Sequence, residues 1–224
     1  MAVESKKIQK MFDDISSRYD LLNRVLSFRR DVRWRKKSIQ KLGIGAGDLV
    51  LDLACGTGDM ILMMPADAFV IGADFSKNML KVASDKVKAP LVAADATVLP
   101  FGDNIFNKLT ITFGFRNVED KQQALKEMYR VLKPGGKLCI LEFSKPKSKI
   151  FSAIYWLYFD FVLPLVGRLV SGHESAYKYL PESVKDFPPE GEYRLMIERA
   201  GFGSLAFICY DFGICTAAIA NKSI

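Results

Sequence analysis

A carboxylate and two glycines follow one another at the end of an apolar run, in the stretch VLDLACGTGD from Val50 to Asp59. Asp52 lies four residues before Gly56, and Gly58 comes two residues later. Glycine has no side chain, so a ligand can approach the backbone of such a loop closely. A helix that begins beyond the loop would add unpaired N–H donors. The spacing therefore predicts a ligand-binding loop directly after a buried strand.

The type of ligand follows from the absence of a third glycine in the loop and from the carboxylate of Asp52. A loop that binds the pyrophosphate of a dinucleotide has a third glycine three residues after the second, and Ile61 stands at that position here. A carboxylate at Asp52 would repel a pyrophosphate but could hold a cation. A nucleoside with a positively charged or amino-bearing tail fits best, and S-adenosylmethionine is such a ligand.

Two further acids stand at the ends of the next two expected strands. Asp74 lies 22 residues after Asp52, where a carboxylate can accept hydrogen bonds from both ribose hydroxyls. Asp95 and Ala96 would take the adenine amino group through the carboxylate and a ring nitrogen through a backbone N–H. Each acid alone could be a solvated strand-end carboxylate, but three of them beside a glycine loop favour a cofactor site.

Alternating strand and helix patterns must position these residues. Short apolar runs predict strands at 48–54, 68–75, 90–96, 108–115, 135–144, 204–212 and 214–220. Helical periodicity predicts helices at 4–18, 30–42, 77–87 (capped by Ser76), 120–132 and 192–202, with a short one after Gly58. Repeated strand–helix units form parallel sheets that bind ligands at the carboxyl ends of the strands. We expect an α/β fold with a mainly parallel seven-stranded sheet, helices on both faces and a C-terminal antiparallel hairpin.

The composition fits one domain. The chain has 224 residues, of which 50% are hydrophobic, enough to bury a sizeable core. We expect a single domain over 1–224, with an N-terminal helical arm at about 1–45 and a helical insertion at about 146–188 that covers the substrate. The formal net charge of +7 favours an anionic membrane surface, nucleic acid or an acidic ligand, or is simply a solvated basic surface.

The cysteines and the histidine predict no metal site. Cys55, Cys139, Cys209 and Cys215 form no CxxC pair, and His173 is the sole histidine. Reduced thiols in a cytoplasmic protein are the simplest interpretation. The polar stretch MAVESKKIQKMFDDI at the start of the sequence predicts no secretory signal.

In its longer motifs the chain resembles the ubiquinone and menaquinone biosynthesis C-methyltransferases, which are Rossmann-like class I methyltransferases. The likeness spans nearly the whole chain and rests on YDLLNRVLSFRRDVRW (19–34), LDLACGTGD (51–59), LPFGDNIFNKLTITFGFRNV (99–118), RVLKPGGKLCILEFSKP (130–146) and AYKYLPESV (176–184). The glycine motif marks only the broad class, whereas FGFRN together with LEFSKP is narrow. The sequence departs from the usual family pattern at Leu22, where methionine is common, and at Asp31, where histidine is common.

The resemblance implies methyl transfer from S-adenosylmethionine to a ring carbon of a polyprenylated benzoquinol or naphthoquinol. It also implies cofactor contacts at Thr57, Asp74, Asp95, Ala96 and Thr112. The full expected cofactor site adds Tyr19, Asp52, Gly56 and Gly58. Two alternatives are a methyltransferase for another apolar or phenolic small molecule, and a non-catalytic nucleotide-binding or membrane-surface protein.

The reaction needs a group that stabilises a phenolate opposite the methyl group, because a ring carbon becomes nucleophilic when a neighbouring hydroxyl loses its proton. Arg116 and Asn117 follow the expected fourth strand. The pKa of arginine exceeds about 12, so Arg116 would hold a phenolate or a proton-accepting water rather than act as a base. Asn117 would orient it. A structural link from Arg116 to loop carbonyls is the alternative.

Aromatic residues in the insertion offer an apolar surface for the ring and the isoprenoid tail. They are Tyr155, Trp156, Tyr158, Phe159 and Phe161. Tyr177, as a catalytic group, and Tyr179 would place hydroxyls near the quinol, while Tyr19 and Asp20 would close over the cofactor. The alternatives are plain core packing for the aromatic residues and a helix-terminus role for Tyr19 and Asp20.

The apolar segment 150–170 is long enough to cross a bilayer, but Asp160, Pro164 and Arg168 argue against a span. We expect an amphipathic, aromatic-rich helical cap or an interfacial segment instead. Basic residues near an anionic leaflet contribute about 1 kcal/mol each, which favours contact with a membrane surface, and the alternative is that the segment only folds over the cofactor. The basic residues that flank it are Lys145, Lys147, Lys149 and Arg168. The expected result is reversible, salt-sensitive binding at the inner face of the membrane.

Nucleic acid is not expected as a partner, since the sequence has no NPPY-like base-methylation motif. A homodimer is left open.

Overall fold

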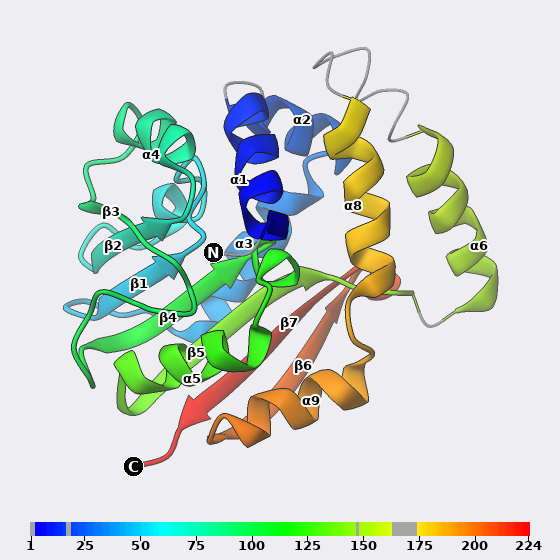
Figure 1. Cartoon of the computed structure of the whole chain (residues 1–224). Helices are drawn as coiled ribbons and strands as arrows, with labels where there is room; N and C mark the ends of the chain where they lie inside the picture. The colour runs from blue at the N-terminus through cyan, green and yellow to red at the C-terminus, as the bar shows by residue number, and fades with distance from the viewer. Residues whose placement is uncertain (1–2, 17–18, 147, 163–173) are drawn as a thin grey trace.

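The computed structural model describes residues 3–16, 19–146, 148–162 and 174–224. A seven-stranded sheet in the order β3–β2–β1–β4–β5–β7–β6 runs through it (Figure 1). The strands are β1 (Leu49–Leu53), β2 (Phe69–Asp74), β3 (Leu91–Ala93), β4 (Phe106–Thr112), β5 (Leu132–Phe143), β6 (Phe202–Tyr210) and β7 (Cys215–Lys222). The first five pair in parallel, and β7 is antiparallel to both β5 and β6. The predicted mainly parallel sheet with a C-terminal hairpin is confirmed.

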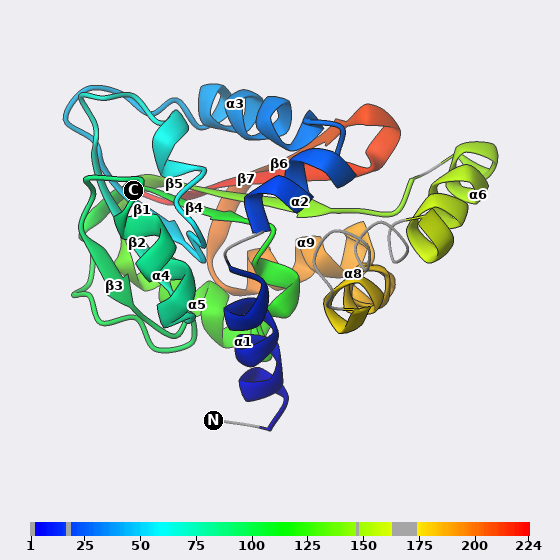
Figure 2. The same cartoon turned by 90° about the horizontal axis from the view of Figure 1, so that it is seen from above.

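Helices cover both faces of the sheet, as expected (Figure 2). On one face lies α3 (Arg30–Leu42), whose Trp34 and Leu42 pack with Leu141 of β5. On the other face lie α4 (Lys77–Ser84), α5 (Lys121–Val131) and α9 (Glu190–Arg199). Met128 and Ile197 of this layer belong to the largest apolar cluster. Burial on both faces explains why the central strands are nearly continuous apolar runs.

A third group of helices stands over the carboxyl ends of the strands. It contains α1 (Val3–Ile15), α2 (Tyr19–Leu26) and α8 (Glu174–Asp186) (Figure 1). Ile15 of α1, Met79 of α4 and Val184 of α8 share one apolar cluster. To one side lie α6 (Lys149–Leu157) and a π-helical turn over Tyr158–Val162. These helices roof the edge at which parallel sheets bind ligands.

Two local expectations differ from the structure. The helical pattern expected over 4–18 ends at Ile15, and a separate helix, α2, begins at Tyr19. The helix expected after Gly58 is a single 3-10 turn, Ile61–Met63. Met64 precedes Pro65 and is extended, because a residue before proline is disfavoured in the helical region. The glycine loop is therefore not followed by an α-helix that could offer its N-terminus to a ligand.

No helix within the described residues is long and apolar enough to cross a membrane. Part of the apolar segment considered above, 163–170, lies outside those residues.

Candidate cofactor-binding site

A cavity of about 630 Å³ opens at the carboxyl ends of β1, β2 and β4, a volume typical of small-molecule sites. Its walls contain many of the residues expected at the site: Tyr19, Gly56, Asp74, Asp95, Ala96, Thr112 and Asn117. These residues are spread over nearly 100 positions of the sequence, and the parallel strand ends bring them together.

The two glycines of the loop have different roles. Gly56 has a φ of +55°, and a Cβ added to it would meet no atom within 4 Å. It lines the cavity, so a ligand can lie against its backbone. Gly58 has a φ of +85°, and its added Cβ would lie 2.9 Å from Val87. Its missing side chain makes room for the end of the α4 segment, which is a packing role.

Asp74 holds the glycine loop in place. Its Oδ2 accepts a hydrogen bond of 2.8 Å from the N–H of Gly56, and its Oδ1 accepts one of 2.8 Å from the N–H of Ser76. Burial raises the pKa of this carboxyl, and the two backbone donors oppose the shift. A carboxylate fixed in this way is preorganised to accept further hydrogen bonds from a ligand in the cavity.

Asp95 and Thr112, near the ends of β3 and β4, also fit a ligand. Asp95 accepts hydrogen bonds from the N–H and the hydroxyl of Thr97, at 2.8 and 2.7 Å, so the loop after β3 is fixed. Thr112 lines the cavity, and its buried hydroxyl has no hydrogen-bond partner among the described residues. A buried hydroxyl without a partner carries a desolvation cost that a bound ligand would remove.

Asp52 and Thr57 do not line the cavity. Asp52 accepts a hydrogen bond of 2.6 Å from Thr110 through Oδ1, and its Oδ2 is enclosed without a partner among the described residues. Burial raises the pKa of Asp52 to about 7. Thr57 donates its hydroxyl to Asp20 of α2, so in this structure it links the loop to a helix.

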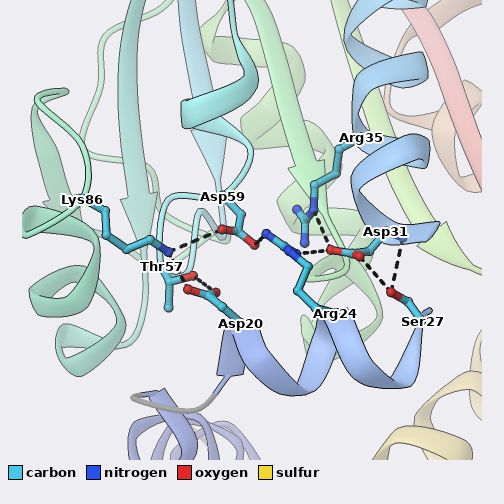
Figure 3. A network of polar contacts seen from close by, with 8 residues as sticks. All are labelled: Asp20, Arg24, Ser27, Asp31, Arg35, Thr57, Asp59 and Lys86. Carbon is cyan, nitrogen blue, oxygen red and sulfur yellow. Dashed lines mark hydrogen bonds and ion pairs between the residues drawn. The ribbon is translucent and has the colours of Figure 1, made fainter. Parts of the chain in front are cut away.

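A network of charged residues joins α2 to the glycine loop (Figure 3). Arg24 forms ion pairs with Asp31 and, at 2.7 Å, with Asp59. Lys86 forms an ion pair with Asp20 and a longer one, of 3.4 Å, with Asp59. Ser27 also donates to Asp31 at 2.8 Å. The network holds α2 beside the loop and leaves Tyr19 in the cavity wall.

No motif in the sequence predicts a role for Arg24, Asp59 or Lys86, and Asp31 stands out there only as a departure from the family pattern. Opposite charges at 24, 31 and 59 were the one available signal, and a solvated surface would give the same signal.

Helix α1 supplies a wall of the cavity that the sequence did not indicate. Ile8, Gln9 and Phe12 line it, and the Gln9 amide donates to the carbonyl of Phe75 at 3.1 Å. Asp13 of the same helix accepts from Ser76. An amphipathic helix presents such residues whether it covers a ligand or a core, so the pattern alone could not distinguish the two.

The guanidinium of Arg116 forms an ion pair and hydrogen bonds with other protein groups. It follows β4 in a 3-10 turn, Phe115–Asn117. Its guanidinium binds Glu142 at 2.7 Å, the carbonyl of Phe113, and Ser183 at 3.3 Å. The contact with Phe113 is the kind expected of a structural link to a loop carbonyl.

The pair is almost completely buried, with side-chain exposures of 5% for Arg116 and 2% for Glu142. The carboxylate of Glu142 and the hydroxyls of Tyr19 and Tyr179 raise the pKa of Arg116 against the opposing effect of burial. Arg116 therefore keeps its positive charge in this environment. Glu142, in the motif LEFSKP, had no assigned role.

Of the remaining residues expected near the quinol, some line the cavity and others do not. Asn117 lines the cavity, and its Oδ1 accepts a hydrogen bond of 3.0 Å from Tyr179. Tyr177 lies in α8, but its side chain is outside what the structure describes. Tyr155 and Phe159 are buried in the cluster around Val184, and the structure does not bring them into the cavity wall.

Within the described residues, no group of His, Cys, Asp and Glu could hold a metal ion. His173 lies outside them. The four cysteines are free, and Cys209 alone among them is exposed.

Comparisons with known proteins agree with this geometry. The profile of the ubiE/COQ5 methyltransferase family matches residues 1–222. The chain is 43% identical to the ubiquinone/menaquinone biosynthesis C-methyltransferase UbiE of Geotalea uraniireducens, covering 98% of this chain and 97% of the relative. It is 44% identical to the demethylmenaquinone methyltransferase of Thermus thermophilus, covering 95% and 100%.

Among solved structures, a SAM-dependent methyltransferase of Thermotoga maritima, described as a possible histamine N-methyltransferase, superposes with a TM-score of 0.68. The sequence identity is 18%, and the match covers 96% of this chain and 99% of the other. At that identity the likeness concerns the fold.

Proposed function

The chain belongs to the ubiE/COQ5 methyltransferase family, and on that premise we propose that it transfers the methyl group of S-adenosylmethionine to a ring carbon of a polyprenylated quinol. The observation that carries the proposal is the cavity at the strand ends, which gathers Gly56, Asp74, Asp95 and Thr112 in one wall. The relatives are named for ubiquinone and menaquinone biosynthesis, and demethylmenaquinol or a ubiquinol precursor is the proposed acceptor.

The cofactor supplies a sulfonium methyl group that is already activated for attack. We assign its ribose to Asp74 and its adenine to Asp95 and Ala96, as the strand-end positions suggest. The hydroxyl of Thr112 would gain the partner that it lacks. The protein contributes alignment and exclusion of water, which together lower the barrier of a bimolecular methyl transfer.

The acceptor ring is assigned to the side of the cavity bounded by Tyr19 and Asn117. Methyl transfer forms one carbon–carbon bond and breaks the sulfur–carbon bond, and the ring then loses the proton of the attacked carbon. Arg116 lies next to Asn117 and stays charged, so it would favour the phenolate form of the ring through its field. Asn117, held by Tyr179, would orient the ring hydroxyl.

The test is the quinone content of cells without the protein. Removal of the protein from its source cell should lead to accumulation of a demethylated quinone, identified by mass spectrometry. Return of the wild-type chain should restore the methylated product, whereas return of Asp74→Ala should restore it poorly. An unchanged quinone pool would instead favour a methyltransferase for another apolar or phenolic molecule.

A polyprenylated substrate resides in a membrane, and we propose reversible contact of the protein with the inner face of that membrane. An apolar surface on α2 and the turn after it supports this contact. Leu21, Val25 and Phe28 are 56%, 44% and 74% exposed, and Phe28 reaches Tyr158 of the insertion with ring centroids 6.1 Å apart. Phe28 has a φ of 51°, a costly conformation for a large side chain.

Positive charge lies next to this surface. Arg29 and Arg33 are exposed at the start of α3 and its first turns. Basic residues near an anionic leaflet contribute about 1 kcal/mol each, and apolar side chains at the interface add to that. The sequence predicted membrane contact through a different set of basic residues, the lysines beside the segment 150–170. Lys147 lies outside the described residues, and the contact between Phe28 and Tyr158 joins the two surfaces.

Co-sedimentation with phosphatidylglycerol vesicles tests the contact. Phe28→Ser and the pair Arg29→Glu, Arg33→Glu should each reduce binding, and salt should reduce binding of the wild type. The lysine pair Lys147→Glu, Lys149→Glu tests the neighbouring segment in the same way. Phe69→Ser is the matched control, because Phe69 is 69% exposed at the start of β2. Equal binding by all variants, or binding insensitive to salt, would reject the contact.

A further inference from the structure

The outer face of α3 carries a row of exposed cations. This helix covers one face of the sheet, on the side away from α4 and α5 (Figure 2). Its inner side is buried and includes Trp34 and Leu42. The exposed basic residues of the helix, and the one just before it, are Arg29, Arg30, Arg33, Lys36, Lys37 and Lys41. Spacings of three and four residues put such side chains on one side of a helix.

Little negative charge balances this row. Asp31 is the sole acid of α3, and it is buried in its contact with Arg24. Among the described residues, one ion pair reaches the row, between Arg30 and Asp211 at 3.1 Å. The helix has 13 residues, which rise about 20 Å along its axis. Positive charge concentrated along such a length attracts an anionic surface.

Two exposed phenylalanines stand at the N-terminal end of the row. Phe28 is 74% exposed, and Phe212, in the turn between β6 and β7, is 78% exposed. Asp211 ties that turn to α3, because its Oδ2 accepts a hydrogen bond of 2.6 Å from Trp34 and its Oδ1 pairs with Arg30. The two aromatic residues and the cations therefore belong to one surface, although they come from opposite ends of the sequence.

Both phenylalanines have an unusual backbone conformation. Their φ angles are 51° at Phe28 and 60° at Phe212, in the left-handed region that large side chains rarely adopt. Strain of this kind persists mainly at sites of function. Since most of each ring is exposed, packing within the protein gives little return for that strain. Burial of the rings in the interfacial layer of a membrane would give one.

We propose that this surface, the outer face of α3 with Phe28 and Phe212, docks on an anionic lipid bilayer with α3 parallel to the membrane plane. The proposal rests on the proposed function, which gives the protein a membrane-borne acceptor. It extends the contact argued above for α2 to a whole side of the molecule and so fixes its orientation. The side that carries α4 and α5 then faces away from the lipid (Figure 2).

This orientation puts the cavity close to the lipid. Helix α2 runs from Tyr19, in the cavity wall, to Leu26, two residues before Phe28. Its eight residues rise about 12 Å. The side of the cavity assigned to the acceptor ring is therefore separated from the docked surface by the length of one short helix, while the isoprenoid tail of the acceptor remains in the bilayer.

Two other uses of a basic helix face compete with this one. A row of cations can simply keep a protein in solution, and then no particular side of the molecule would bind vesicles. A nucleic acid duplex would also be attracted by the cations, but it offers no apolar layer for Phe28 and Phe212. The exposed aromatic residues therefore favour the lipid.

Co-sedimentation with vesicles of phosphatidylglycerol and phosphatidylcholine tests the surface through two matched triple variants. Arg33→Gln, Lys36→Gln, Lys41→Gln removes three charges from α3 and should weaken binding on the order of 10- to 100-fold, since each basic residue near the leaflet contributes about 5-fold. The control removes three exposed charges from α4 and α5 and should stay within about 3-fold of wild type. It is Lys77→Gln, Lys81→Gln, Lys126→Gln.

Fluorescence tests whether the turn between β6 and β7 meets the lipid. Phe212→Trp should be quenched by brominated phosphatidylglycerol, after subtraction of the wild-type signal from Trp34 and Trp156. Phe69→Trp is the control, because Phe69 is 69% exposed at the start of β2, and it should not be quenched. This measurement does not depend on the loss of binding in any variant.

Equal weakening by the two triple variants, or no quenching of Phe212→Trp, would overturn the proposal. Binding of a DNA duplex more tightly than vesicles, with loss of that binding in the α3 triple variant, would assign the surface to nucleic acid and overturn it as well. Calorimetry with S-adenosylhomocysteine keeps the proposed function separate. The α3 triple variant should bind this ligand as wild type does, and failure of the wild type to bind it would reject the proposed function whatever the vesicles show.

Discussion

Two buried arginines lie near the cavity, and their surroundings differ. Arg116 is held by Glu142, by the carbonyl of Phe113 and by Ser183. Among the residues that the structure describes, the nearest ionic partner of Arg35 is Asp31, at 3.9 Å. A guanidinium that protein groups hold in an ion pair and hydrogen bonds contributes to the folded state and acts on a ligand through its field. A buried guanidinium with no close partner adds a desolvation cost to the folded state. Proximity to the same cavity therefore does not give two residues the same role.

Removal of the Glu142 carboxylate should cause the largest loss of unfolding free energy among these variants. Glu142→Gln leaves the charge of Arg116 buried and unpaired, and such a loss costs roughly 3 to 5 kcal/mol of unfolding free energy. Urea denaturation measures it. The double variant Arg116→Met, Glu142→Leu should recover most of the loss, because it removes both charges. Destabilisation of the double variant beyond that of Glu142→Gln would show that the pair itself stabilises the fold.

Asp52 offers a pH-dependent test of the region around Arg35. Its pKa in the folded protein is about 7, against 3.8 for the free side chain. A raised carboxyl pKa contributes stability that is present below pH 4 and lost as the pH rises toward and through 7. The difference corresponds to at most about 4 kcal/mol. Asp52→Asn should therefore show a flatter unfolding free energy between pH 4 and 7 than wild type. Parallel pH profiles of the two proteins would contradict this expectation.

Asp74 tests the cavity wall directly, because this residue lines the cavity. Asp74→Ala should lose roughly 1 to 3 kcal/mol of affinity for S-adenosylhomocysteine, because ribose hydroxyls would be left unpaired in a partly buried site. Calorimetry measures it, with Asp85→Ala at the C-terminus of α4 as a control away from the cavity. Since Asp74 also holds Gly56, part of the loss reflects movement of the loop. Unchanged affinity would remove Asp74 from the site.

Arg35→Met should have the smallest effect on stability. No hydrogen bond to a described residue is broken, and one buried charge is removed, so the unfolding free energy should change by less than about 1 kcal/mol. Thermal unfolding without ligand measures it, beside Glu142→Gln under the same conditions. A loss as large as that of Glu142→Gln would place Arg35 with Arg116 as a structural residue, and the contrast between the two regions would disappear.

The cofactor half of the site was predictable to a large extent. Asp74, Asp95 and Ala96 were expected at strand ends, Thr112 was implied by the family resemblance, and all four line the cavity. The topology of a parallel sheet puts its carboxyl ends on one edge, so strand assignment alone gathers these residues. Asp52 shows the limit of that reasoning. Alternate residues of a strand point to opposite faces, and Asp52 faces Thr110 rather than the cavity.

The proposed acceptor side of the cavity and the contacts of α2 were less predictable. FGFRN and LEFSKP were noted as separate motifs, and only the pairing of β4 with β5 brings Arg116 against Glu142. Asp31 was noted because it departs from a pattern, and its role appeared once α2 was found beside the glycine loop (Figure 3). Aromatic residues of the insertion could not be divided into core and surface, because both uses give the same composition.

The sequence by itself determined the order of the strands and of most helices, the closely spaced glycine loop and the acids at the ends of β2 and β3. Each of these depends on residues within a few positions of one another, where hydrophobic period and backbone preference act directly. Only the tertiary structure decided which charges are paired. The burial and the partners of Arg35 and Arg116 come from segments 4 to 67 positions away, and their free energies depend on distances and desolvation that exist only after α2, α3 and α8 have packed over the strand ends.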